Sequence, residues 1–192
     1  MNNNVKELPL IRGKVLQKLL KDHLFEKYTG SGLFHLSPNR NLVSPMRPRR
    51  PVKGNTTSVV IGEADVARIS FAETIPECFM GIYMNFSHYF DKLKVPFIDL
   101  CLYAAKLKTT TKIIGPTDLT KYTMVYDAHV TNEYSVMEAI PIELIATVRI
   151  YNCSKGEFVA VKPFGNENSG STYMLPDPIE LKFDINEYKL GE

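Results

Sequence analysis

Tryptophan is absent from this 192-residue chain, and cysteine occurs only three times. The cysteines form no CxxC pair and stand at no zinc-like spacing with histidine, which argues against a structural zinc site. Two of them, Cys78 and Cys101, lie in apolar stretches, so we expect buried free thiols and a reducing compartment. Without tryptophan, ten Phe and ten Tyr must supply the large aromatic side chains of the core.

The motifs of several enzyme classes are also missing. The chain has no GxSxG for nucleophilic catalysis, no GxxxxGK[ST] or GxGxxG loop for phosphate, and no HExxH for zinc hydrolysis. One polar trio, Asn85, His88 and Asp91, has the spacing that places side chains on one helix face, where they could bind a metal or transfer protons. We interpret it instead as the polar edge of a buried helix. We therefore predict no catalytic residues, no metal and no cofactor.

Long apolar runs are absent as well. A membrane-spanning helix needs roughly 20 apolar residues. The longest candidate, 95–107, is interrupted by Pro96, Asp99 and Lys106. The polar N-terminal residues MNNN are not followed by the apolar core of a signal peptide. We expect a protein that is in solution or bound to a surface and does not cross a bilayer.

Charge is plentiful but unevenly distributed. Residues 1–53 carry eleven Lys and Arg against three Asp and Glu, whereas the remaining 139 residues carry twelve against eighteen. The net charge of +2 therefore joins a basic arm of +8 to a body of −6. Such a basic region predicts contact with something anionic, which includes the acidic body of a neighbouring copy.

The basic arm combines two kinds of segment. Residues 13–28 have the apolar period of an amphipathic helix, which predicts a helix docked on its own domain or one that meets a membrane or a partner. Residues 37–55 are rich in Pro and Arg, which predicts an extended tether or a polyanion-binding segment. The predicted membrane- and polyanion-binding residues are Lys14, Lys18, Lys21, Arg40, Arg47, Arg49, Arg50 and Lys53; the predicted self-association residues are Leu16, Leu19, Leu20 and Leu24.

Residues 56–192 predict a single α+β domain, with a largely antiparallel sheet packed with two or three helices. The basic, Pro-rich arm of residues 1–55 precedes this domain. A turn at 152–156 predicts a hairpin between the strands on either side of it. The predicted helices are 81–93 and 96–107, and the predicted strands are 56–62, 65–72, 109–114, 122–130, 142–151, 157–163 and 179–185.

The order of these pieces resembles the matrix proteins of rhabdoviruses. Those proteins have a similar length, a flexible basic arm with prolines, and one α+β domain. The corresponding pieces here lie within 60–185 and are the strand 67–72, the helix 81–93, the stretch around Pro96 with the helix to 107, and the strands 142–151 and 157–163. Many animal-virus members carry a PPxY or PTAP motif for particle release. This chain has neither, which fits a virus of plants or insects better.

The resemblance implies a non-enzymatic viral structural protein that self-assembles, condenses the nucleocapsid and links it to the inner face of the envelope. It implies four partners: further copies of the chain in head-to-tail contact, viral nucleoprotein–RNA, an anionic membrane surface and the tail of the viral glycoprotein. The implied location is the virion, under the envelope, and the host cytoplasm or nucleus and the inner face of its membrane during infection. We expect deletion of residues 1–53 to abolish assembly and membrane binding while the body stays folded.

Two other functions fit the residues. A hot-dog-fold acyl-thioester enzyme or binder would wrap a long sheet around one helix and use Asn85, His88 and Asp91 as its site. The break at Pro96 and the arginines, which this function leaves unexplained, argue against it. An RNA-binding accessory protein would use the cations of residues 37–55 as a sequence-independent phosphate clamp. No aromatic residues interleave those arginines, which argues against base stacking.

Overall fold

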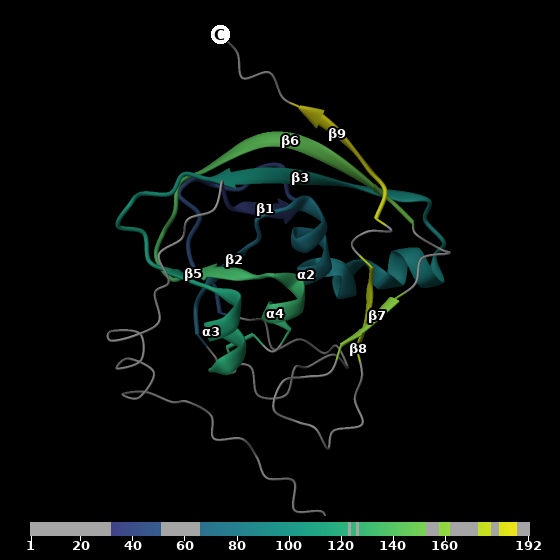
Figure 1. Cartoon of the computed structure of the whole chain (residues 1–192). Coiled ribbons are helices and arrows are strands. Elements are labelled where there is room, and N and C mark those ends of the chain that lie inside the picture. The colour runs from purple at the N-terminus through teal and green to yellow at the C-terminus, as the bar shows by residue number, and fades with distance from the viewer. Residues whose placement is uncertain are drawn as a thin grey trace, which may run out of the picture.

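The computed structural model describes residues 32–50, 66–122, 124–125, 127–152, 158–161, 173–177 and 181–187. In this part of the chain, antiparallel sheets of four, three and two strands pack with short helices, so the predicted α+β class is confirmed (Figure 1). The helix expected at 13–28 and the strand expected at 56–62 lie outside the described residues.

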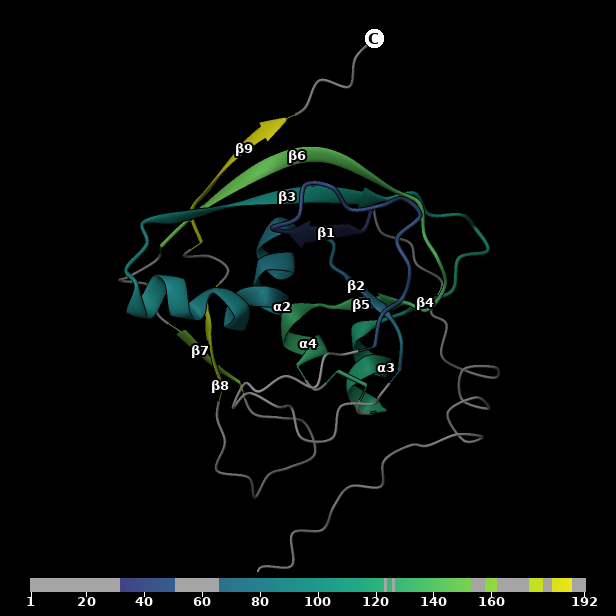
Figure 2. The ribbon, with the colours of Figure 1, turned by 180° about the vertical axis from the view of Figure 1, so that it is seen from behind.

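The four-stranded sheet has the strand order β1-β3-β6-β9. It arches over the helices and the smaller sheets in both ribbon views (Figures 1 and 2). Its strands are β1 (Phe34–Ser37), β3 (Phe97–Ala105), β6 (Ile142–Tyr151) and β9 (Phe183–Glu187). All neighbours are antiparallel, and the long central pair, β3 with β6, sets Leu100 opposite Val148.

The smaller elements lie below this sheet (Figure 1). The three-stranded sheet has the order β2-β5-β4 and the two-stranded sheet pairs β7 with β8. Their bounds are β2 (Ile69–Phe71), β4 (Ile113–Ile114), β5 (Tyr134–Val136), β7 (Phe158–Val161) and β8 (Tyr173–Pro176). The helices are α2 (Ile75–Ser87), the π-helical turn η1 (His88–Lys92), α3 (Pro116–Lys121) and α4 (Ala128–Thr131).

The core is built around β3, which is covered on both faces. Leu100 and Leu102 pack in one apolar cluster with Phe79 of α2. Cys101 and Tyr103, whose side chains alternate with those leucines, belong to a second cluster with residues of β2 and β5. Because each face of β3 meets a different layer, the strand joins the helix layer to the small sheet.

Helix α2 begins at a capping box. The backbone N–H of Glu77 donates to Thr74 Oγ1 at 3.4 Å, and the Glu77 carboxylate accepts from the backbone N–H of Thr74 at 3.0 Å. These bonds satisfy N–H groups that have no partner within the helix. The helix expected at 81–93 therefore exists but starts earlier, at Ile75.

Three expected elements are wrong. Residues 97–105 form a strand where a helix was expected at 96–107, and residues 128–131 form α4, which overlaps the strand expected at 122–130. The hairpin expected around 152–156 does not form, because β7 pairs with β8 while β6 pairs with β3 and β9. The strand expected at 142–151 is confirmed as β6, and those at 65–72, 109–114, 157–163 and 179–185 contain or overlap β2, β4, β7 and β9.

Candidate anion-binding groove

The Pro/Arg segment that was expected to be an arm or tether is attached to the body over residues 38–50, called the strap below. Strand β1, just before it, pairs with β3 from Phe34 to Ser37. In the strap itself, the backbone N–H of Met46 donates to the Ile140 carbonyl at 2.8 Å, and the reciprocal bond is 2.9 Å long. Residues 33–50 are thus part of the folded body.

Two hydrogen bonds that involve side chains hold the strap on the body. The buried Tyr103 hydroxyl donates to the Asn39 carbonyl at 2.8 Å. The strap's Ser44 hydroxyl accepts from the Ile142 backbone N–H at 3.1 Å. Because these bonds join residues that are far apart in sequence, the path of the strap depends on the completed sheet.

A groove of about 560 Å³ opens between β1, β2, the strap and the start of α2. Its apolar lining includes Phe34, Leu42 and Phe71. Its basic lining consists of three arginines, Arg47, Arg49 and Arg68. Its acidic lining, Glu77 and Glu133, comes from α2 and from the turn after α4.

The arginines converge because of backbone pairing. The N–H of Arg49 donates to the Arg68 carbonyl at 3.1 Å, and the N–H of Arg68 donates to the Arg49 carbonyl at 3.0 Å. Residues directly opposite each other in such an antiparallel pair have Cβ atoms about 4.5–5.5 Å apart on one face. Arg47, two residues earlier in an extended segment, lies on the same side as Arg49. Three arginines from two separate segments therefore line one groove.

This arrangement favours an anionic ligand. Like charges placed directly opposite in a β-pair destabilise it. The charge of Arg68 already acts on the carboxyl of Asp127, and an anion bound beside Arg49 and Arg68 would offset the like charges further. Guanidinium groups present a planar fork of N–H donors that matches phosphate and carboxylate oxygens. Of the two carboxylates in the lining, that of Glu77 already accepts from Asn132 Nδ2 at 2.9 Å.

His35 is a residue of β1 that lines the groove and contacts β2. Its Nδ1 is 2.9 Å from the Ser70 carbonyl oxygen, and its ring meets Phe71 edge-on with centroids 6.1 Å apart. Burial lowers the pKa of His35 below its usual 6.5, although the bond to Ser70 opposes that shift. The ring is thus neutral at pH 7 and adds no charge to the arginines.

The residues that could carry covalent or metal chemistry are poorly placed for it. Burial raises the pKa of the Cys78 thiol to about 12, which leaves it protonated and unreactive at neutral pH. Asn85, His88 and Asp91 are all exposed, and the Tyr83 hydroxyl donates to Asp91 at 3.5 Å. In the described residues, no group of three or more His, Cys, Asp or Glu side chains is placed to hold a metal ion.

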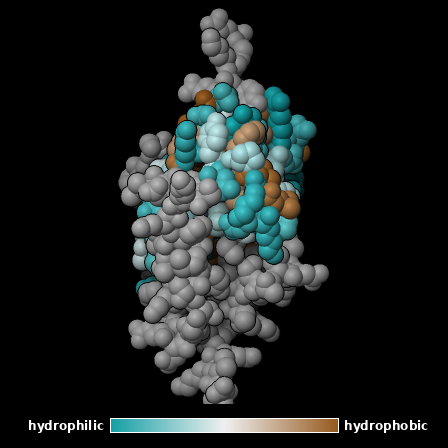
Figure 3. All heavy atoms as spheres, turned by 90° about the vertical axis from the view of Figure 1, so that its right-hand side faces the viewer, coloured by the Kyte–Doolittle hydropathy of each residue, from teal (hydrophilic) through white to brown (hydrophobic). Residues whose placement is uncertain are grey.

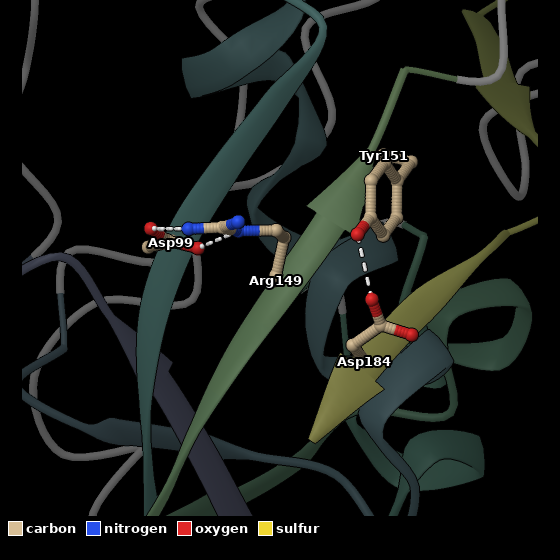
Figure 4. A network of polar contacts seen from close by, with 4 residues as sticks. All are labelled: Asp99, Arg149, Tyr151 and Asp184. Carbon is tan, nitrogen blue, oxygen red and sulfur yellow. Dashed lines mark hydrogen bonds and ion pairs between the residues drawn. The ribbon is translucent and has the colours of Figure 1, made fainter. Parts of the chain in front are cut away.

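A second polar network lies on the outer face of the large sheet (Figure 4). Arg149 of β6 donates to both carboxylate oxygens of Asp99 on β3, at 2.8 and 2.9 Å. This pairing lowers the pKa of Asp99 and raises that of Arg149. The Tyr151 hydroxyl donates to Asp184 of β9 at 2.6 Å, which raises the pKa of Tyr151. These cross-strand pairs satisfy one another and connect three strands.

The structure places four of the residues that were predicted to bind a membrane or a polyanion. Arg47 and Arg49 line the groove, whereas Arg40 and Arg50, which are also exposed on the strap, do not line it. Arg68 was missed because it belongs to a different segment, and only the strand pairing brings it to the site. The other predicted site residues, which lie outside the described residues, are Lys14, Lys18, Lys21, Lys53, Leu16, Leu19, Leu20 and Leu24.

The chain was compared with protein-family models, curated proteins and solved structures. No protein-family model, curated protein or solved structure matches this chain. A search of the described helices for one long and apolar enough to span a membrane finds none.

Proposed function

We propose that this chain is a non-enzymatic structural protein of the viral matrix type. In this role it assembles with further copies of itself and condenses viral nucleoprotein–RNA. It also links that complex to the anionic inner face of an envelope membrane. The observation that carries the proposal is the convergence of Arg47, Arg49 and Arg68 on one groove through the pairing of two separate segments.

The charge distribution of the sequence supports the same role. A chain with a basic N-terminal region and an acidic remainder can place the basic surface of one copy against the acidic surface of the next. Such a contact joins two different surfaces, so it can repeat without closing into a dimer. The groove gives this basic region a defined receptor for carboxylates or phosphates within the folded body.

The experiment compares two variants with the same kind of change on neighbouring positions. Arg47→Ala/Arg49→Ala/Arg68→Ala removes the groove cations. Arg40→Ala/Arg50→Ala removes exposed cations of the strap that do not line the groove. Each full-length protein is mixed with viral nucleoprotein–RNA at low and high salt, and the condensed product is measured by sedimentation and negative-stain microscopy.

We expect wild type and the strap control to form salt-sensitive assemblies, and the groove variant to lose most of them while staying folded by circular dichroism. Assemblies of equal yield from the groove variant would refute the role given to the groove. Binding to naked RNA that is retained without any self-assembly would favour an RNA-binding accessory protein, a role that the same arginines also fit.

A further inference from the structure

The end of the helical segment that follows α2 carries large apolar side chains in an exposed position. Leu93 is 57 % exposed and Tyr89 is 46 % exposed. They are four residues apart around η1, so they lie close together on one side of it. Phe90, between them in sequence, turns inward instead, where it is 4 % exposed and its ring meets that of Phe79.

The backbone holds this end in an unusual conformation. The N–H of Leu93 donates to the His88 carbonyl at 3.1 Å, a π-type bond that spans five residues. Lys94 then has φ 54°, a left-handed conformation that is uncommon for a residue with a side chain. Asn152 Nδ2 donates to the Phe90 carbonyl at 3.3 Å. The exposed position of Leu93 is therefore fixed by the body around it.

The charges around Leu93 are mainly positive. Lys92 and Lys94 flank it and are exposed, and the exposed Lys182 lies at the same end of the sheet, over the ring of Tyr151. The acidic residues of this end are Asp91, which lies on the same turn as Lys92, and Asp184, which accepts a hydrogen bond from Tyr151. Figure 3, which faces this end of the molecule, shows apolar atoms in brown next to hydrophilic atoms in teal.

We propose that Tyr89, Lys92, Leu93 and Lys94, called the tip below, form a contact site for an anionic lipid surface. Leu93 and Tyr89 enter the boundary between headgroups and acyl chains, where tyrosine is favoured because its ring is apolar and its hydroxyl is polar. The two lysines extend their stems along this surface and place their ammonium groups among anionic headgroups. This inference rests on the proposed function and adds to it a membrane-binding surface on the body.

A lipid surface fits the tip better than a symmetric contact with the tip of a second copy does. In a symmetric dimer each tip would meet its own copy, and Lys92 and Lys94 would then face lysines of the other chain. An anionic membrane instead complements the lysines and accepts the leucine between them.

The absence of tryptophan allows a direct test in the full-length protein. Leu93→Trp places a single tryptophan at the tip, and Thr110→Trp places one on the exposed turn that follows the opposite end of β3. Each variant is mixed with phosphatidylcholine vesicles that contain or lack phosphatidylserine. We expect a blue shift of the Leu93→Trp emission, and quenching by brominated lipid, with the anionic vesicles alone, and no shift for Thr110→Trp.

Two results would overturn the proposal. One is an unchanged Leu93→Trp emission with anionic vesicles. The other is a blue shift that grows with protein concentration in the absence of lipid, which would assign the tip to a contact between copies.

The lysines provide an independent measurement. Lys92→Ala/Lys94→Ala should weaken vesicle flotation by roughly thirtyfold, since each lysine near an anionic surface contributes about fivefold in affinity. Lys108→Ala/Lys121→Ala, which removes the same charge elsewhere on the body, should retain most of the binding. Equal loss in both variants would contradict a localised site. Loss of flotation at the tip with normal nucleoprotein condensation would separate this inference from the role of the groove.

Discussion

The arginine groove and the tip are both basic, but they are built in opposite ways. The groove is concave, and its cations come from two segments, paired through Arg49 and Arg68, that meet only in the completed fold. The tip is exposed, and its cations flank Leu93 within one short stretch of chain. A surface assembled from distant segments depends on folding, whereas a surface within one turn can be altered with little effect on the core.

The largest expected effect is on folding, and it depends on the residue at which a shortened chain starts. A chain that starts at residue 32 retains β1 and Leu33, which is fully buried. A chain that starts at residue 54 loses both, together with the strap. We expect the first to fold cooperatively and the second to be unfolded or aggregated, as judged by circular dichroism and thermal melting. A stable 54–192 fragment would restore the earlier expectation that residues 1–53 are a removable arm.

Truncating a leucine beside the groove should lower the stability of the protein much more than truncating the leucine of the tip. Leu36 of β1 is 3 % exposed within the apolar cluster around α2, so Leu36→Ala leaves a cavity and should lower the free energy of unfolding by about 2–5 kcal/mol. Leu93→Ala should change it by no more than about 0.5 kcal/mol, because the side chain is already largely in water. Urea denaturation measures both. Similar decreases in the free energy of unfolding for the two variants would show that the tip is as much a part of the core as the groove side is.

His35 should make the free energy of unfolding depend on pH. Burial lowers the pKa of His35 below 6.5 in the folded protein. As the pH falls, His35 is therefore protonated in the unfolded chain before it is protonated in the folded protein. Stability is then complete above about pH 6.5 and falls as the pH drops through the window below it. His35→Gln should flatten the dependence by at most about 1.4 kcal/mol per pH unit. Parallel stability curves for the variant and wild type between pH 5 and 7 would show that His35 is not responsible.

The smallest effect should have opposite signs on stability and binding. Arg49→Glu replaces a like-charged pair with an attractive pair opposite Arg68, so it should raise the free energy of unfolding by about 0.2–1 kcal/mol. It should also weaken binding to a polyanion. Arg50→Glu is the control, since Arg50 does not line the groove. A destabilised Arg49→Glu protein would mean that the groove arginines do not repel each other.

The secondary structure was predictable where apolar spacing has a single interpretation. The strand predicted at 142–151 from its alternating apolar residues is β6. The alternation did not show that the pairing shifts at Ile145, so that Ile142 and Leu144 pack in a different cluster from Val148. The apolar residues of β3 were assigned to a helix because a strand buried on both faces has no alternation to display. Pro96 reinforced the error, since proline is favoured at the first position of a helix.

The long-range pairing could not be read from local patterns. Both β3 and β9 pair with β6, although the turn after β6 suggested a local hairpin. The same limit applied to the groove. The composition of the strap makes Arg47 and Arg49 candidates, but nothing near Arg68 in sequence indicates that it would lie opposite Arg49. Sites formed by pairing between segments require the register, and local propensity does not supply it.

The salt dependence of binding to a single-stranded RNA tests the central role of the groove most directly. If Arg47, Arg49 and Arg68 each contact a phosphate, the plot of log affinity against log salt concentration should be shallower by about 2 for the triple alanine variant than for wild type. The Arg40→Ala/Arg50→Ala protein should keep a slope close to that of wild type. An unchanged slope in the triple variant would contradict an anion-binding groove.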